Sequence, residues 1–343
     1  MTRSTHRFLA KLVSSAAERI GLLSAIRKRR LRRGDRRLFI LEYHDISFDG
    51  TRPGKSAVTT SRFKDQVEVL SGSYSLESLE QVVSQMGDSH TFPDDILVVT
   101  FDDGYLSNYE LAWPNLASQG VPATIFLTTS FLDGIPLWFD LAREALEFLR
   151  SHTEAVSYRV KRELLRTFGY WPRFKTVDGE IEFLKYQSGA KRQSLLSALE
   201  DSDVPLPSPT RALTWGQVRE MKTSGMISFG AHTVSHPILS TLSRPDQERE
   251  IEESATRILE ETGQRPSCFA YPNGSARDFT SETIEILSSR GFSSACTTVR
   301  GSNRPDADLL RLRRIGVGED SNVLLKARLS GLFDSELRRW IGA

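Results

Sequence analysis

Two adjacent carboxylates, Asp102 and Asp103, end an apolar run in the segment TFDDGY at residues 100–105. The residues before them, ILVV at 96–99, have the composition of a buried strand. Two like charges side by side are costly at such a place unless a positive group lies next to them. A divalent metal ion at the strand end is the simplest group that meets this need.

Two histidines with helical spacing, His232 and His236, stand in the segment AHTVSHP at 231–237. Residues four apart on a helical turn project to the same side, and one added carboxylate completes a three-ligand site with an open position for water. Such a donor set suits Zn²⁺ or another divalent first-row ion. Each motif alone is weak, since Asp-Asp-Gly is also a common turn. Both motifs at strand ends of one chain predict a metal site.

Short β-rich runs alternate with amphipathic helical patterns along most of the chain. This alternation predicts parallel strands joined by helices, and about seven runs suggest a barrel, with an incomplete barrel as the alternative. The expected strands are 38–44, 95–101, 122–129, 226–232, 267–272, 292–298 and 312–317, and the expected helices between them are 106–119, 214–224, 245–262 and 280–290.

Polar residues close several of these strands. His44 ends LEYH, and Asn273 follows AYP. In parallel α/β architectures, functional groups gather at the carboxyl ends of the strands. We therefore expect His44 and Asn273 to converge on one face with the paired aspartates and the two histidines.

Two segments stand apart from the alternating pattern. Residues 130–210 read mainly as helix and end in the proline-rich DSDVPLPSPT, so we interpret them as a helical insertion in a barrel of residues 38–343. Residues 1–37 hold 12 Lys and Arg against 2 Asp and Glu, a net charge of +10 that leaves the remainder at −9.

The N-terminal segment 8–26 is amphipathic, and the basic run RKRRLRR follows at 27–33. Two interpretations remain open: a helix on an anionic membrane surface, or a helix docked on the barrel beside a solvated charge run. Nucleic-acid binding is disfavoured because no recognisable module surrounds the basic run.

A cytoplasmic location is the default expectation. No apolar run approaches the ~18 residues of a membrane span. Lys11, Glu18 and Arg19 interrupt the apolar core that a signal peptide needs. Ordinary hydrophobic and charged contents of 39% and 26% argue against global disorder. Cys268 and Cys296 are expected to be reduced core residues, with a bridge between neighbouring strands as the alternative.

TFDDGY, HTVSHP and FAYPNG together resemble the first three motifs of the polysaccharide deacetylases, carbohydrate esterases with a NodB-type homology domain. The resemblance covers roughly residues 38–130 and 211–318. It implies a distorted (β/α)7-type barrel, a divalent metal, and hydrolysis of N-acetyl groups on amino sugars.

The family motifs imply roles for individual positions. Asp103, His232 and His236 match the metal ligands, and Asp102 matches the catalytic base that takes a proton from water. The backbone N–H near Asn273 matches a donor to the developing oxyanion. The resemblance thus explains the paired carboxylates: one binds metal, and the other acts as the base.

The chain departs from the commonest family pattern in two places. Ala270 stands where many relatives have an arginine, so we expect Arg314 to orient Asp102, with a surface arginine as the alternative. No histidine follows His236, so the family's leucine-x-histidine motif is missing. LEYHDIS resembles the first-strand motif of deacetylases of exopolysaccharide biosynthesis, and His44 is our candidate general acid or substrate-binding group. A satisfied core histidine is the alternative.

Tyr105 and Trp138 are expected to offer aromatic faces to a sugar ring. The resulting hypothesis is a metal-dependent deacetylase acting on an exopolysaccharide or its lipid-linked precursor, with possible membrane contact through residues 1–33. Three alternatives remain: a peptidoglycan deacetylase, an amino-sugar deformylase, and a non-catalytic carbohydrate-binding barrel.

Overall fold

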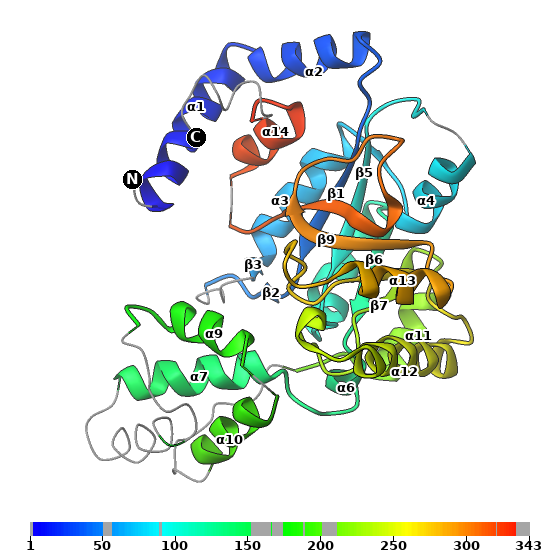
Figure 1. Ribbon diagram of the computed structural model, residues 1–343. Coiled ribbons are helices and arrows are strands. Elements are labelled where there is room, and N and C mark those ends of the chain that lie inside the picture. Colours follow the sequence, from blue (N-terminus) through cyan, green and yellow to red (C-terminus); the bar gives the residue numbers. More distant parts are fainter. Residues whose placement is uncertain are drawn as a thin grey trace.

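The computed structural model describes residues 3–50, 57–88, 91–151, 166, 174–187, 189–200, 211–319 and 321–333. Seven parallel strands form its central barrel (Figure 1). They are β1 (Leu38–Tyr43), β5 (Ile96–Phe101), β6 (Ala123–Leu127), β7 (Ile227–Ala231), β8 (Cys268–Ala270), β9 (Ser294–Arg300) and β10 (Leu312–Gly316). These are the seven strands that the sequence predicts.

The barrel closes through the pairing of β1 with β5, which runs from Leu38 opposite Ile96 to Tyr43 opposite Phe101. Around the ring the order is β1, β10, β9, β8, β7, β6 and β5. A short extra strand, β4 (Ser75–Leu76), pairs with the amino half of β5, and β2 (Ile46–Ser47) pairs with β3 (Val58–Thr59) outside the barrel. The incomplete-barrel alternative is therefore wrong.

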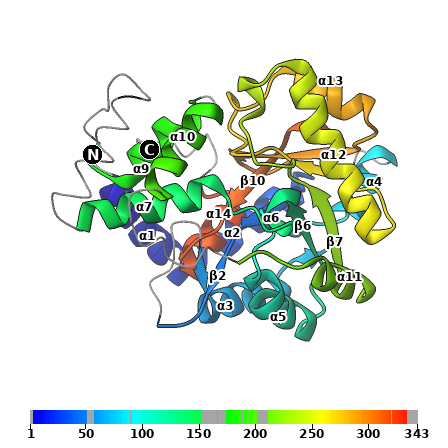
Figure 2. The ribbon, with the colours of Figure 1, turned by 90° about the horizontal axis from the view of Figure 1, so that it is seen from below.

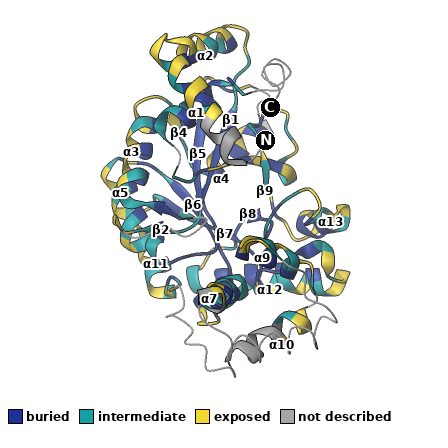
Figure 3. Cartoon of the chain, turned by 90° about the vertical axis from the view of Figure 1, so that its left-hand side faces the viewer, coloured by how far each residue is buried: buried dark blue, intermediate teal, exposed yellow. Residues whose placement is uncertain are grey.

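Helices surround the barrel (Figure 3). They include α3 (Thr60–Ser71), α4 (Leu79–Asp88), α5 (Trp113–Ser118), α11 (Trp215–Thr223), α12 (Arg244–Thr262) and α13 (Ser281–Ser289). Capping boxes begin two of them: Thr214 and Gln217 at α11, and Thr280 and Thr283 at α13. These reciprocal bonds satisfy backbone N–H groups that have no partner within the helix.

The interior of the barrel changes from apolar to polar along the strands. Alternate residues of β1 point inward, with Leu38 and Ile40 in an apolar cluster and Glu42 beyond them. Leu312 and Arg314 repeat this order on β10. Side chains of α4 close the apolar end. Because strand residues alternate between two faces, one register places the polar groups together at the carboxyl ends.

Cys268 and Cys296 belong to this interior apolar cluster, and both are free and buried. Burial raises the pKa of the Cys268 thiol to about 11. The expectation of reduced core cysteines is confirmed, and the alternative of a bridge is wrong.

The insertion contributes α6 (Thr129–Leu132), α7 (Trp138–Ser151), α9 (Val177–Lys185) and α10 (Gly189–Glu200). Figures 1 and 2 show α7, α9 and α10 gathered at one side of the barrel. The proline-rich segment 201–210 lies outside the described residues. Treating 130–210 as an insertion in a 38–343 unit, and 1–37 as a separate unit, stays a prediction.

The N-terminal segment forms α1 (Arg3–Arg19) and α2 (Leu22–Arg32), which pack beside α14 (Asn322–Ser330). Ala17 and Leu23 share an apolar cluster with Ala327 and Leu332. Within the part of the chain that the structure describes, no helix combines the length and apolar character needed to cross a membrane.

Candidate active site

Strained backbone marks the loops that follow β5, β7 and β8. Among the described residues, four non-glycine residues have positive φ: Asp103 (72°), Thr233 (68°), His236 (56°) and Asn273 (59°). Such conformations are costly and cluster at functional sites. At Gly104, which has φ 88°, an added Cβ would lie 3.0 Å from Leu127 and Leu132. The glycine of TFDDG is therefore required by the turn that presents the aspartates.

Asp103, His232 and His236 converge into one buried cluster. Asp103 Oδ1 lies 3.6 Å from His232 Nε2 and 3.4 Å from His236 Nε2. The two imidazole ring centroids are 4.8 Å apart. Three residues from two strand ends thus aim their ligand atoms at one point.

The chemistry of these donors fits a divalent cation. His232 donates from Nδ1 to the Ala270 carbonyl at 2.7 Å, so the lone pair of the neutral ring is on Nε2. Burial lowers the pKa of His232 to about 4 and that of His236 well below its usual value. Asp103 Oδ1 is buried without a hydrogen-bond donor. A buried carboxylate oxygen in this state is costly unless a cation satisfies it.

Asp102 points to a different partner. Arg314 donates from Nη1 and Nη2 to the two Asp102 oxygens, both at 2.7 Å, and from Nε to the Thr297 carbonyl at 3.0 Å. Burial alone would raise the pKa of Asp102, but Arg314, with a smaller effect from His232, holds it well below its usual value. Arg314 is fully buried, so it is not a surface arginine.

His44 lies beside the same carboxylate. Its Nε2 is 4.0 Å from Asp102 Oδ2 and 3.9 Å from Glu42 Oε1. Burial would lower the pKa of His44, yet the carboxylates of Asp102, Asp103 and Glu42 together raise it. The side chain is 26% exposed, so His44 is not a satisfied core histidine.

Sequence reasoning missed Glu42, although an acidic residue inside the apolar strand LFILEY was a usable signal. Glu42, His44 and Asp102 also lie close enough to hold a cation. The Arg314 guanidinium already supplies positive charge there, with Nε 3.6 Å from Glu42 Oε2 and a two-pronged bond to Asp102. Of the two groups, the Asp103 cluster is therefore the better candidate for a cation.

The insertion reaches the site through residues that the sequence did not single out. The Phe139 ring centroid is 4.9 Å from that of His236, and Asp140 accepts a hydrogen bond from the Tyr105 hydroxyl at 3.1 Å. Trp138 instead packs against Arg192, whose guanidinium carbon lies 4.9 Å from the centroid of the Trp138 ring. Only the fold brings α7 to the aspartate and histidine cluster, because the Phe139–His236 and Tyr105–Asp140 contacts join residues more than thirty positions apart.

Tyr105 and Asn273 are both held in place at this end of the barrel. The Tyr105 ring is buried and packs edge-on against Phe131, with centroids 5.6 Å apart. The Asn273 carbonyl accepts a hydrogen bond from Thr298 at 2.6 Å, which fixes the strained loop after β8.

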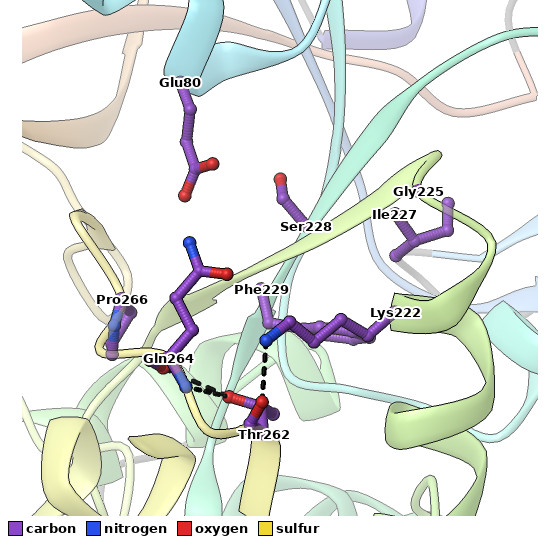
Figure 4. Close-up of a pocket in the computed structure, with 9 residues that line it drawn as sticks. All are labelled: Glu80, Lys222, Gly225, Ile227, Ser228, Phe229, Thr262, Gln264 and Pro266. Carbon is purple, nitrogen blue, oxygen red and sulfur yellow. Dashed lines mark hydrogen bonds between the residues drawn. The ribbon is translucent and has the colours of Figure 1, made fainter.

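A separate small pocket lies at the opposite end of the barrel (Figure 4). Ile227 and Ser228, at the start of β7, line it together with Glu80 and Gln264. Lys222 at its edge donates to the Thr262 carbonyl at 2.6 Å. His232 follows the other end of the same strand, so this pocket is not part of the aspartate and histidine cluster.

The family model for polysaccharide deacetylase matches residues 89–163 and 184–295, more than half of the chain. Similar solved structures include Streptococcus pyogenes deacetylase PplD in complex with acetate, with 20% identity, a TM-score of 0.57, and coverage of 85% of this chain and 97% of that one. IcaB from Ammonifex degensii is 20% identical, with a TM-score of 0.56 and coverage of 86% of this chain and 97% of that one. The BpsB deacetylase domain from Bordetella bronchiseptica is 19% identical, with a TM-score of 0.51 and coverage of 81% of this chain and 94% of that one.

No curated protein matches the chain. At these identities the solved structures show the shared barrel fold, while the family model also matches the segments that carry TFDDGY, HTVSHP and FAYPNG. The chain belongs to the polysaccharide deacetylase family.

Proposed function

We propose that the protein is a metal-dependent hydrolase that removes N-acetyl groups from amino sugars of an exopolysaccharide or its lipid-linked precursor. One observation carries this proposal: three ligand atoms converge beside a second buried carboxylate that is held by its own arginine. Hydrolysis of an amide needs both an electrophilic centre and an ionised base next to it. The solved structures named as deacetylases support the same chemistry by analogy.

Asp103, His232 and His236 would hold the ion, and we take it to be Zn²⁺ on the basis of the donor set. When bound, such an ion supplies a Lewis acid that polarises water and the amide carbonyl. The carboxylate of Asp103 then gains the positive partner that its buried oxygen lacks among the described protein groups.

Asp102 is the general base in this proposal. It accepts a proton from the attacking water while Arg314 fixes both carboxylate oxygens and keeps the group ionised. The new C–O bond forms acetate as the C–N bond breaks. His44 donates a proton to the departing amine nitrogen, and the neighbouring carboxylates, which raise the pKa of its ring, favour the protonated form.

Two of the remaining predicted residues would bind substrate. The backbone N–H at Asn273 would donate to the developing oxyanion, and Tyr105 would contact the sugar. Trp138 packs against Arg192 away from the ligand cluster, so we do not give it the predicted role in sugar binding. We place the reaction in the cytoplasm, where residues 1–33 would contact the inner face of the membrane. A lipid-linked precursor would be met at that surface.

The test is acetate release from chitooligosaccharides and from an N-acetylated exopolysaccharide extract by the zinc-reconstituted protein. We expect activity in the wild type and its loss in Asp102→Asn with bound zinc unchanged. Asp246→Asn, the same change on the exposed surface of α12, is the matched control and should keep full activity.

Two results would overturn the proposal. Equal activity in Asp102→Asn would remove the base from the mechanism. Zinc binding without acetate release from any substrate would favour a deformylase, detectable as formate from N-formylated sugars, or a non-catalytic binding barrel.

A further inference from the structure

We propose that α1 and α2 dock the protein on an anionic lipid bilayer through surfaces that the barrel leaves exposed. The apolar part of this surface is the α1 stripe, defined as Leu9, Leu12, Val13, Ala16 and Ile20. The charged part is the α2 cation set, defined as Lys28, Arg29, Arg32 and Arg33.

The α1 stripe lies on a different face from the one that packs on the protein. Successive helix residues are rotated by about 100°, which places the stripe residues within an arc of about 100°. Ser14 and Ala17, on another face, are buried, and Glu18 pairs with Lys326 at 2.8 Å. Leu12 is 52% exposed and Ile20 is 76% exposed. The helix is thus anchored through Ser14, Ala17 and Glu18 and presents the α1 stripe to solvent.

The basic run of α2 is divided in a similar way. Arg30 is buried and donates two hydrogen bonds to Asp95, at 2.8 and 2.6 Å, and Arg27 donates to the same carboxylate at 3.0 Å. These two arginines attach α2 to the amino end of β5. The four residues of the α2 cation set are exposed.

Exposed apolar side chains on one helix and exposed cations on the next match the interface of an anionic bilayer. Apolar groups enter the boundary between headgroups and acyl chains, while Lys and Arg bind the headgroup phosphates. A second copy of the chain fits less well, because it would bring two segments of net charge +10 together. Nucleic acid would satisfy the cations but leave the α1 stripe in water.

The two N-terminal helices lie at different places relative to the active site. Figures 1 and 2 show α1 on the same side of the barrel as α7 and α9. The insertion helix α7 carries Phe139, whose ring contacts His236 of the aspartate and histidine cluster. α2 is attached at the amino end of β5, whereas the aspartate and histidine cluster lies at the carboxyl ends of the strands, so the contact lies on a flank of the barrel. The docking surface specifies the membrane contact of the proposed function, and delivery of a lipid-linked sugar to the site rests on the proposed deacetylase activity as well.

Sedimentation of the full zinc-loaded chain with vesicles tests the proposal. We compare phosphatidylcholine vesicles with vesicles that also contain phosphatidylglycerol, in the wild type, Leu12→Asp/Ile20→Asp, and a variant with all four α2 cations changed to Gln. Leu259→Asp is the matched control, because Leu259 is an exposed leucine on α12, away from the N-terminal helices.

We expect wild type and Leu259→Asp to bind the anionic vesicles and to be released by salt. The stripe variant should bind at least about tenfold more weakly, and loss of each cation that contacts the surface should cost about fivefold. Acetate release from soluble chitooligosaccharides should be unchanged in every variant, which separates this proposal from the proposed function.

Undiminished vesicle binding in the stripe and cation variants would overturn the assignment of the surface. Absence of wild-type binding to anionic vesicles would overturn the choice of a bilayer. A wild-type dimer in vesicle-free solution that Leu12→Asp/Ile20→Asp converts to monomer would instead assign the stripe to self-association.

Discussion

Asp102 and Asp103 are adjacent in the chain, yet the barrel gives their carboxylates opposite surroundings. Asp102 accepts two hydrogen bonds from Arg314 on β10, and this arginine holds the pKa of Asp102 well below the usual value. Asp103 faces two neutral histidines, and burial raises its pKa to about 7 in the absence of a cation. Environments that separate two neighbouring carboxylates in this way assign them different roles. In the proposed mechanism, Asp102 stays charged and acts as the base, and Asp103 takes the cation as its partner.

The largest expected effect comes from removing the ligand carboxylate. Asp103→Asn should lose zinc on dialysis and with it all activity, whereas Asp102→Asn should keep zinc and lose about 10²–10⁴-fold in kcat. Zinc content by atomic emission and kcat on chitooligosaccharides measure the two effects. Equal zinc loss in both variants would contradict the division of roles.

The next effect concerns the partner of the base. Arg314→Gln leaves the Asp102 carboxylate buried without its cation, and breaking a buried pair costs about 3–5 kcal/mol in the free energy of unfolding. Because the folded-state pKa of Asp102 is depressed, the stability it contributes is present above the ordinary aspartate pKa and is lost as pH falls towards the folded value. The difference in the free energy of unfolding between the wild type and Arg314→Gln should therefore be largest at neutral pH and become smaller at acidic pH.

Urea unfolding of the wild type and Arg314→Gln at neutral and acidic pH checks this prediction. Arg314→Lys, which keeps the charge without the two-pronged geometry, should fall between them. A double-mutant cycle with Asp102→Asn that shows no coupling would mean that the pair contributes nothing.

A smaller effect is expected for the proposed acid. His44 must carry a proton to donate it, so kcat should fall as pH rises through the raised pKa of His44. Glu42→Gln removes one of the carboxylates that raise this pKa, and the alkaline limb of the kcat profile should move to lower pH. The same limb in the wild type and in His44→Asn would show that another group supplies the proton.

The smallest effect should come from the link between the site and the insertion. Tyr105→Phe removes the hydrogen bond to Asp140, which is worth about 0.5–1.5 kcal/mol. The thermal midpoint measures the loss of stability, and zinc affinity shows whether the loss reaches the nearby ligand Asp103. Tyr186→Phe removes a comparable bond to Asp278 outside the ligand cluster and should leave zinc affinity unchanged.

Local patterns predicted the elements well. Runs such as ILVVTF became buried strands because an apolar run of this length, bounded by turn residues, can be buried on both faces in a parallel barrel. One N-terminal amphipathic helix was also predicted, but the structure divides it at Gly21 into α1 and α2, and the orientation of α1 was not predicted. Which of its faces docks depends on α14, more than three hundred residues away in the chain.

The sequence by itself determined the seven strands, the metal-ligand motifs and the positions where polar groups end the strands, because each is encoded within a few neighbouring residues. The sequence offered Arg314 as a candidate partner of Asp102, but only the tertiary structure decided between that role and a surface arginine. Only the tertiary structure showed that Glu42 lies beside His44 and that Phe139, not Trp138, reaches the ligand cluster. These contacts depend on barrel closure and strand register, which bring together side chains from β1, β5 and β10 and from the insertion.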